Sequence, residues 1–304
     1  MKNNDLVLGI DIGGTTVKFG VVGSGYRLLM TTSIPTCAQQ GVEAIISRII
    51  EKAKYLRTVY PFSAVGIGTP GTVDYKNGIC VRASNLPYKN TPMASTVSQS
   101  LDCPVLLGND AACAIAGELY AGCGKQYKDF VMITLGTGVG GGIVIDGKPY
   151  MGSWGGAGEI GHIILDYDGR LCHCGQRGCY EQYASVTALI RQTREAAEAN
   201  PQSLLAQLCE DSITGKTAFD AASAGCPVAA AVIDRYTGYA AAGITSIMRV
   251  FQPEAVILGG AISEQGDNLL LPIRDKCVLP ADIKISELKN NAGLLGAAAL
   301  IKET

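Results

Sequence analysis

The segment from Gly158 to Glu181 contains four side chains suited to binding one metal ion. Histidine nitrogen and cysteine thiolate are the usual ligands of tetrahedral structural zinc. The alternative is that these are four polar or thiol residues of an ordinary loop. This alternative is disfavoured, because packing alone seldom requires the run Cys-x-Cys-Gly-x-x-Gly-Cys. We therefore predict a zinc site formed by His162, Cys172, Cys174 and Cys179.

Two carboxylates flank this predicted zinc site. Glu159 precedes His162 by three residues, and Glu181 follows the last cysteine by two. A loop fixed by metal and flanked by acids is suited to presenting polar side chains to a polar ligand. His173 stands between two cysteines and is a competing ligand, but a Cys-x-Cys pair directs the intervening side chain elsewhere, so His162 is preferred.

Two glycine-rich turns each contain a threonine. They read Asp11-Ile12-Gly13-Gly14-Thr15 and Leu135-Gly136-Thr137-Gly138. Glycines let backbone N–H groups approach phosphate oxygens, and threonine hydroxyls add donors. A single turn is equally well read as structural, but two, each between strand-like runs, indicate a nucleotide held from both sides. Neither matches the Walker pattern or the dinucleotide fingerprint. Asp11 is placed to position hydrated Mg²⁺.

Asn109 and Asp110 end a buried strand where a helix begins. Both residue types are favoured helix caps, so a purely structural role is one reading. Ligands of open α/β sheets, however, collect at the carboxyl ends of strands. A carboxylate there can accept a proton from a sugar hydroxyl that attacks a γ-phosphate.

The predicted elements fall into two halves with related openings. Strand-like runs at 6–10 and 17–22 flank the first turn, and runs at 130–135 and 142–145 flank the second. Apolar residues at three- and four-residue spacing predict a helix from Val42 to Ala53. Further strands are predicted at 64–67, 105–107 and 255–258, and helices after 110, at 228–250 and at 293–300. The pattern indicates two α/β halves.

Composition excludes some classes of protein. The 304 residues are 47% hydrophobic, with a formal net charge of −2 and no dense block of Lys or Arg, unlike a nucleic-acid binder. No apolar run of membrane-spanning length and no export signal is present, so we expect a cytoplasmic protein. The eleven cysteines are then expected to be reduced. Cysteines 113, 209, 226 and 277 are expected to fill the core.

Five segments together resemble the ROK family of bacterial sugar kinases and repressors. The resemblance runs in order along nearly the whole chain, and the 158–181 segment is its most specific part. One departure is Thr16, where many relatives carry Lys, although Lys18 lies in the same hairpin. The segments are DIGGTTVKFG (11–20), GIGTPG (66–71), NDAACAIAGE (109–118), LGTGVGGGIVID (135–146) and 158–181.

The resemblance implies an actin-like α/β fold with two ribonuclease H-like lobes and ATP in the interlobe cleft. One lobe would comprise residues 1–115 with a C-terminal helix at 292–304, and the other residues 116–291. MgATP and structural Zn²⁺ would be the cofactors. Relatives are usually dimers or tetramers, so a homo-oligomer is expected.

The resemblance also implies roles for single residues. Asp110 would be the catalytic base, and His162 would contact both zinc and sugar through its two ring nitrogens. The implied sugar-binding residues are Asn85, Asn109, Asp110, Glu159, His162, Glu181 and Gly71 with its turn from Gly68. The implied nucleotide-binding residues are Asp11, Gly13, Gly14, Thr15, Gly136, Thr137, Gly138, Gly259 and Gly260.

The function implied is transfer of the γ-phosphate of MgATP to the 6-hydroxyl of a hexose, with no nucleic-acid or membrane partner. Glucose is the first choice because Glu159, His162 and Glu181 suit a hexose with free hydroxyls. N-acetylmannosamine, N-acetylglucosamine, mannose, fructose and allose remain open as acceptors. A repressor is disfavoured because the first strand begins at about Leu6, without room for a DNA-binding domain. A sugar sensor without turnover is disfavoured by the intact Asp11 and Asp110.

Overall fold

A computed structural model describes residues 6–83, 85–153, 156–210 and 212–303. The chain forms two compact units, Met1–Gln126 with Asn290–Thr304, and Tyr127–Lys289. The sequence placed the boundaries at 115/116 and 291/292; the first of these falls inside helix α3 (Asp110–Ala121). Helix α3 packs closely on α10 (Ala292–Lys302): a Cβ on Gly117 would lie 2.2 Å from the Ala292 carbonyl oxygen. That contact keeps α3 whole within the first unit.

The first unit is built on a five-stranded sheet. Its order is β3 (Leu28–Pro35), β2 (Thr16–Val22), β1 (Val7–Ile12), β4 (Ala64–Thr69) and β7 (Val105–Asn109). Strand β2 is antiparallel to both β3 and β1, whereas β1, β4 and β7 run parallel to one another. Strands β1 and β4 are almost continuously buried, as parallel strands covered on both faces must be.

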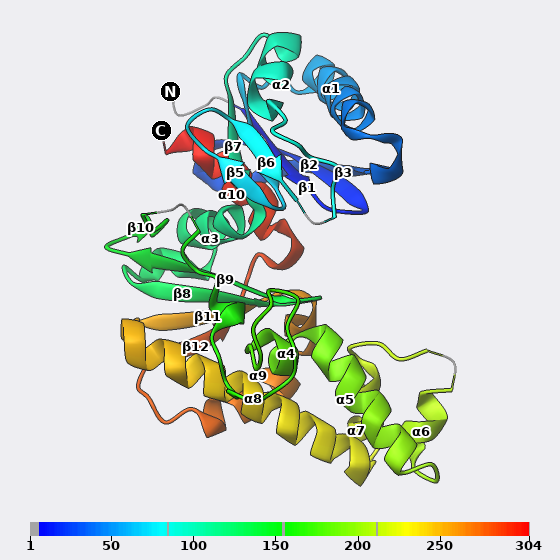
Figure 1. Cartoon of the computed structure of the whole chain (residues 1–304). Helices are drawn as coiled ribbons and strands as arrows, with labels where there is room; N and C mark the ends of the chain where they lie inside the picture. Colours follow the sequence, from blue (N-terminus) through cyan, green and yellow to red (C-terminus); the bar gives the residue numbers. More distant parts are fainter. Residues whose placement is uncertain (1–5, 84, 154–155, 211, 304) are drawn as a thin grey trace. The chain divides into compact units, whose positions relative to one another are not determined.

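Helices cover both faces of this sheet (Figure 1). Residues Leu8 and Ile10 share a core with helix α1 (Val42–Val59) and helix α2 (Met93–Leu101). On the other face, glycine lets α10 approach closely, because a Cβ on Gly66 would lie 1.7 Å from the Ala297 carbonyl oxygen. A short hairpin, β5 (Thr72–Asp74) and β6 (Ile79–Arg82), follows β4.

The second unit repeats the strand order. Its sheet runs β10 (Lys148–Pro149), β9 (Val139–Ile145), β8 (Phe130–Leu135), β11 (Ala255–Gly259) and β12 (Asp282–Ile285). When only the five strands of each sheet are counted, the order is third, second, first, fourth, fifth in both units. Antiparallel and parallel pairings also recur in the same places. The predicted restart of the pattern at residue 130 is therefore confirmed.

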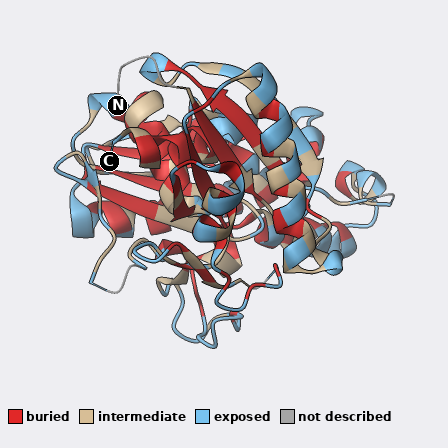
Figure 2. Cartoon of the chain, turned by 90° about the horizontal axis from the view of Figure 1, so that it is seen from above, coloured by how far each residue is buried: buried red, intermediate tan, exposed pale blue. Residues whose placement is uncertain are grey.

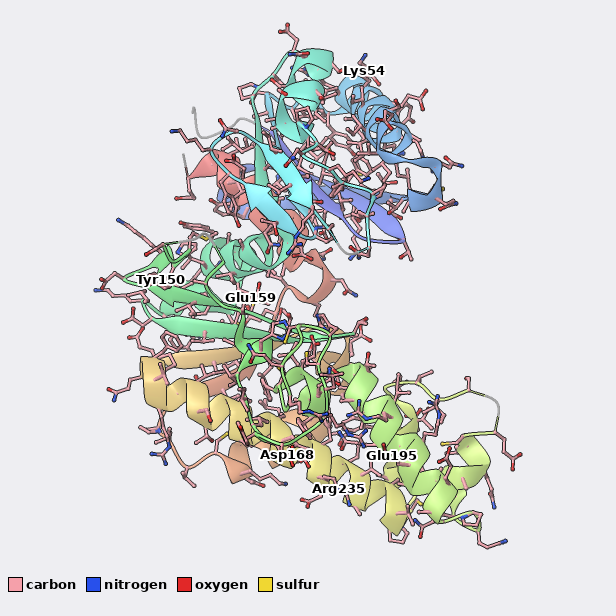
Figure 3. The ribbon with its side chains drawn as sticks, in the orientation of Figure 1. Lys54, Tyr150, Glu159, Asp168, Glu195 and Arg235 are labelled. Carbon is pink, nitrogen blue, oxygen red and sulfur yellow. The ribbon has the colours of Figure 1, made fainter. Side chains whose placement is uncertain are left out.

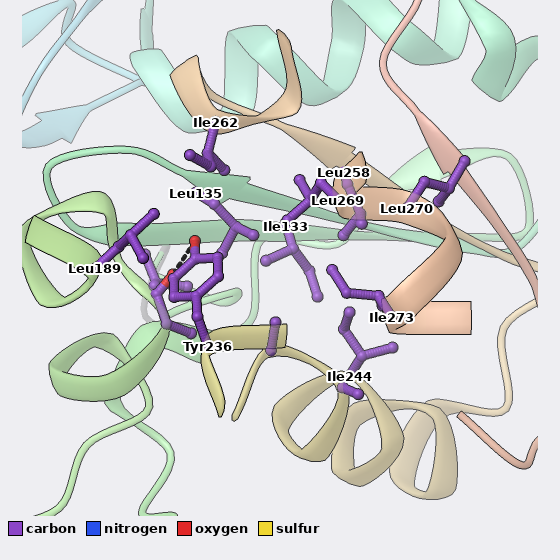
Figure 4. Packing of buried hydrophobic residues seen from close by; sticks show 14 of the residues in the cluster. Ile133, Leu135, Leu189, Tyr236, Ile244, Leu258, Ile262, Leu269, Leu270 and Ile273 are labelled. Atoms are coloured by element: carbon purple, nitrogen blue, oxygen red, sulfur yellow. Dashed lines mark hydrogen bonds between the residues drawn. The ribbon is translucent and has the colours of Figure 1, made fainter. Parts of the chain in front are cut away.

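Helices of the second unit pack around a large apolar core. Tyr236 is fully buried there beside Leu135 and Leu189, and its hydroxyl donates a 2.8 Å hydrogen bond to the Ala184 carbonyl (Figure 4). The strands are largely buried, and helices expose their outer faces (Figure 2). These helices are α4 (Glu181–Ala184), α5 (Val186–Ala199), α6 (Leu204–Leu208), α7 (Thr217–Ser223), α8 (Pro227–Phe251) and α9 (Asp267–Lys276).

Every predicted strand and helix is found, most of them with shifted ends. Strand β9 starts at Val139, although the sequence predicted a turn to Gly141, because pairing with β8 continues through these glycines. Cys113 and Cys226 are buried as expected, whereas Cys209 and Cys277 are half-buried against the core. No helix among the described residues is both long and apolar enough to cross a membrane.

Candidate active site

Strand register brings several predicted site residues of the first unit to one edge of its sheet. Asp11 of β1 pairs with Gly68 of β4, and Thr69 pairs with Asn109 of β7. Because these strands are parallel, their carboxyl ends meet at that edge, the usual ligand edge of such sheets. Gly71 follows directly with φ +94, and a Cβ there would lie 2.2 Å from the Arg82 carbonyl oxygen, so only glycine fits.

Asn109 is both a helix cap and a link to the Gly71 turn. Its Oδ1 accepts a hydrogen bond from the Ala111 N–H at 2.9 Å, and its Nδ2 donates to the Gly71 carbonyl at 2.8 Å. The Oδ1 of Asp110 also accepts from the Ala111 N–H, at 2.8 Å. The capping reading is therefore correct, and it is compatible with chemistry because the Asp110 side chain remains accessible to solvent.

Burial and neighbouring charges shift the pKa values of Asp110 and Asp11. Desolvation by surrounding protein atoms raises the pKa of Asp110, and the nearby charge of Asp11 raises it further. Desolvation also raises the pKa of Asp11, while Lys18 acts in the opposite direction. Lys18 pairs with Asp11 across β1 and β2, and its Nζ donates to the Asn290 carbonyl at 3.2 Å. The site thus holds two carboxylates and one ammonium group.

The first glycine turn is held from behind by one threonine. The Thr36 hydroxyl donates to the Gly13 carbonyl at 2.7 Å, and the Thr36 N–H donates to the Thr15 carbonyl at 2.9 Å. The Gly13 N–H donates to the Thr16 carbonyl at 2.8 Å and closes the turn. Asn85 lies beside the turn, since a Cβ on Gly14 would be 3.0 Å from the Asn85 Nδ2.

The second glycine turn is held by the start of α5. The Val186 N–H donates to the Gly136 carbonyl at 2.8 Å, and the Thr187 hydroxyl donates to the Thr137 carbonyl at 2.7 Å. Gly260, which directly follows Gly259 at the end of β11, packs against the strand that leads into this turn. Its φ is +85, and a Cβ there would lie 2.4 Å from the Leu135 carbonyl oxygen.

The four predicted zinc ligands lie together in the second unit. Their donor atoms are all within 4.8 Å of one another. The Sγ atoms of Cys174 and Cys179 are 3.6 Å apart, and the His162 Nδ1 lies 3.7 Å from the Cys172 Sγ. A tetrahedron with zinc–sulfur bonds of about 2.3 Å has edges of about 3.8 Å. The donor set therefore fits a tetrahedral zinc ion.

His173 lies beside this cluster but makes different contacts. Its Nδ1 is 3.8 Å from the Cys172 Sγ and 3.2 Å from the Glu181 Oε1. Its side chain is 72% exposed, against 27% for His162, and it groups with only one of the three cysteines. His162 directs Nδ1 towards the sulfurs and Nε2 towards Glu159, 4.0 Å from the Glu159 Oε2.

The two predicted sugar-contacting acids of the second unit differ in their surroundings. Glu159, labelled in Figure 3, is exposed and directly precedes the short helix η4 (Ile160–His162). Glu181 is half-buried, and its Oε2 accepts a hydrogen bond from the Val139 N–H at 3.0 Å. A Cβ on Gly138 would lie 2.2 Å from that same oxygen. Glu181 therefore joins the zinc segment to the second glycine turn.

Three residues at the site were not found from the sequence. Thr36 and Thr187 hold the two glycine turns. The third residue is Tyr75, whose pKa is raised to about 12, mainly by burial. The Asn109 backbone and the Asp110 charge also affect this pKa. A threonine after a strand or in the first turn of a helix carries no distinguishing signal. Only the fold shows which backbone carbonyl each hydroxyl reaches.

The chain is similar to known proteins over nearly its whole length. The ROK family matches residues 7–304. The glucokinase of Streptomyces coelicolor is 38% identical over 312 aligned residues, covering 98% of each chain. The glucokinase of Thermotoga maritima is 36% identical, covering 98% of this chain and 97% of its own. A crystal structure of a ROK family glucokinase from Streptomyces griseus in complex with glucose and AMPPNP superposes with a TM-score of 0.85 at 37% identity, covering 98% of this chain and 100% of that one.

Proposed function

The chain belongs to the ROK family and has its actin-like α/β fold, and we propose on that premise that it is an ATP-dependent glucokinase. It would transfer the γ-phosphate of MgATP to the 6-hydroxyl of glucose. The observation that carries this proposal is the exposed carboxylate of Asp110 at the start of α3, beside Asp11 at the ligand edge of the first sheet. Sequence identity of 38% and 36% to two bacterial glucokinases, over 98% of this chain, supports the same activity.

The chemistry of transfer rests on Asp110. Its carboxylate would accept the proton of the 6-hydroxyl as that oxygen attacks the γ-phosphate, while the bond from the γ-phosphorus to the bridging oxygen breaks. A raised pKa makes the ionised Asp110 carboxylate a stronger proton acceptor. Asp11 is suited to hold Mg²⁺ through its water shell, and bound Mg²⁺ would supply neutralisation of phosphate charge.

The nucleotide would be held by backbone groups of the two glycine turns. Carbonyls of the first turn accept hydrogen bonds from Thr36, and carbonyls of the second accept from Val186 and Thr187. N–H groups on the other side of each turn are left available. Oriented backbone N–H groups bind phosphate oxygens well. Gly259 and Gly260 would lie near the adenosine, where Gly260 packs against the start of the second turn.

Sugar binding is assigned to the residues that the resemblance to the family implied. Asn85, Asn109 and Gly71 belong to the first unit, and Glu159, His162 and Glu181 belong to the second. Carboxylates accept hydrogen bonds from sugar hydroxyls, so this set favours a hexose whose hydroxyls are free. N-acetylmannosamine and N-acetylglucosamine are the alternative acceptors. In both sugars an acetamido group stands in place of one of the hydroxyls that the acids would recognise.

Zinc would be bound by His162, Cys172, Cys174 and Cys179 in a structural role. The spacing of their donor atoms supports this assignment. Four protein ligands leave no open position, which is typical of structural zinc. The ion would fix the segment that carries Glu159 and Glu181.

A panel of hexoses and N-acetylhexosamines with MgATP tests the proposal, scored by ADP release and by kcat/KM. We expect glucose to give the highest kcat/KM. No ADP release with any sugar, together with measurable sugar binding, would instead identify a sugar sensor. A higher kcat/KM for an N-acetylhexosamine would keep the kinase and change its acceptor.

A further inference from the structure

We propose that Thr36 and Thr187 are positioning residues for the nucleotide phosphates, each orienting one peptide group of a glycine turn. The inference rests on the proposed nucleotide site. Each hydroxyl donates a 2.7 Å hydrogen bond to a turn carbonyl, Thr36 to Gly13 and Thr187 to Thr137. The two turns thus share one device, although the threonines come from unrelated elements.

The planar peptide group connects each threonine hydroxyl to the direction of a backbone N–H that would bind phosphate. In a trans peptide, the carbonyl of one residue and the N–H of the next point in opposite directions. Holding the Gly13 carbonyl with Thr36 therefore directs the Gly14 N–H away from Thr36. Holding the Thr137 carbonyl with Thr187 directs the Gly138 N–H away from Thr187 in the same way.

The N–H groups set by these contacts remain available. Across the described parts of the chain, no group accepts a hydrogen bond from the N–H of Gly14, Thr137 or Gly138. Thr137 is exposed and Gly14 and Gly138 are half-buried, so these unpaired donors are open to a ligand. The donors match the negative oxygens of a polyphosphate.

A backbone contact accompanies each hydroxyl. The Thr36 N–H donates to the Thr15 carbonyl, and the Val186 N–H donates to the Gly136 carbonyl. These second contacts fix a further peptide in each turn and survive any side-chain substitution. Removing a hydroxyl should therefore release one peptide group and leave the remainder of the turn in place.

The test replaces each threonine by valine, which has the same branched shape without the hydroxyl, and by serine, which keeps the hydroxyl. We expect T36V and T187V each to raise the ATP KM and the Kd for AMPPNP about tenfold, the change expected for one ordered hydrogen bond. The KM for glucose, measured at saturating ATP, should stay unchanged, and T36S and T187S should restore AMPPNP affinity.

A matched control is T193V. The Thr193 hydroxyl donates to the Leu189 carbonyl at 2.8 Å in the same helix as Thr187, but far along it from the turn. It should leave AMPPNP affinity unchanged. If T193V weakens AMPPNP binding as much as T187V, general loosening of α5 explains the result and the proposal is overturned.

Thr36 is buried, so T36V could unfold the protein, whereas Thr187 is exposed. The T187V variant is therefore sufficient to test the proposal. Wild-type AMPPNP affinity in T187V overturns the proposal. A loss that serine does not restore also overturns it, because shape would then matter and the hydroxyl would not. Absence of AMPPNP binding by the wild-type protein would instead count against the proposed kinase function.

Discussion

The two glycine turns occupy equivalent places in two sheets of the same strand order, yet they are held in different ways. Thr36 holds the first turn through both its hydroxyl and its N–H, and is 1% exposed. The second turn depends on Val186 and Thr187 of α5 and on Glu181. The same strand order thus places a glycine turn at the same point of each sheet, although the closing hydrogen bonds and the supporting residues differ.

The difference matters because Glu181 also touches the zinc segment. One of its oxygens accepts from the Val139 N–H, and the other lies 3.2 Å from the His173 Nδ1. The second turn and the zinc segment therefore form one connected region within their unit. The first turn is supported by the end of β3 and by the packing around it, where Thr36 is buried. Perturbations of the two turns should accordingly have different consequences.

The largest expected effect is on the first unit, at Asp110. D110N should lower kcat by about 10²–10⁴-fold, the usual contribution of a general base. Affinity for AMPPNP and glucose should be kept, because an asparagine oxygen can still accept from the Ala111 N–H. Steady-state kinetics and calorimetry check both parts. D102N, at the end of α2, is the matched control and should have normal kcat. A near-normal kcat in D110N would remove the base from the mechanism.

Removal of zinc should have the next largest effect, on the second unit. C174S should lose the metal and weaken glucose binding about 10–100-fold, as loss of support around a site commonly does. Because Glu181 links this segment to the second turn, AMPPNP binding should weaken as well, though less. Metal analysis and calorimetry measure these changes. C209S, outside the cluster, should retain zinc, and unchanged glucose affinity in verified zinc-free C174S would contradict the proposed role.

Substitution of Glu181 separates its two contacts. E181Q keeps an oxygen acceptor for the Val139 N–H but removes the negative charge, so glucose KM should rise about tenfold while ATP KM stays near normal. E181A removes both and should raise both constants. The ratio of the two KM values measures this separation. Equal ATP KM in E181Q and E181A would mean that the contact with Val139 does not support the turn.

Sequence reasoning succeeded where residue type and local pattern carry the information. The Cys-x-Cys-Gly-x-x-Gly-Cys run predicted a cluster whose four donor atoms do lie together. The two glycine turns were predicted correctly because clusters of glycine interrupt the apolar strands. Strand β12, Asp282–Ile285, was missed because four residues with two charges give little apolar signal.

Contacts between distant segments were beyond such reasoning. Thr36 lies 23 residues from Gly13, and Thr187 lies 50 residues from Thr137. The register of β2 and β3, which pairs Thr16 with Pro35, is what brings Thr36 to the first turn. Long-range register depends on packing of the whole sheet, and one sequence does not disclose it.

The smallest expected effect concerns pH and tests the pairing of acids in the first unit. Because desolvation and Asp11 raise the pKa of Asp110, the acid limb of kcat should lie above the ordinary aspartate value of 3.8. The sign follows from the role: a base must be ionised, so kcat falls as pH decreases through that raised pKa. D11N removes one negative charge and should move the limb to lower pH, even though kcat itself falls because Asp11 is suited to hold Mg²⁺. Profiles of log kcat against pH at saturating substrates measure the shift. An unmoved limb in D11N would show that the two carboxylates do not interact, leaving desolvation as the cause of the raised pKa.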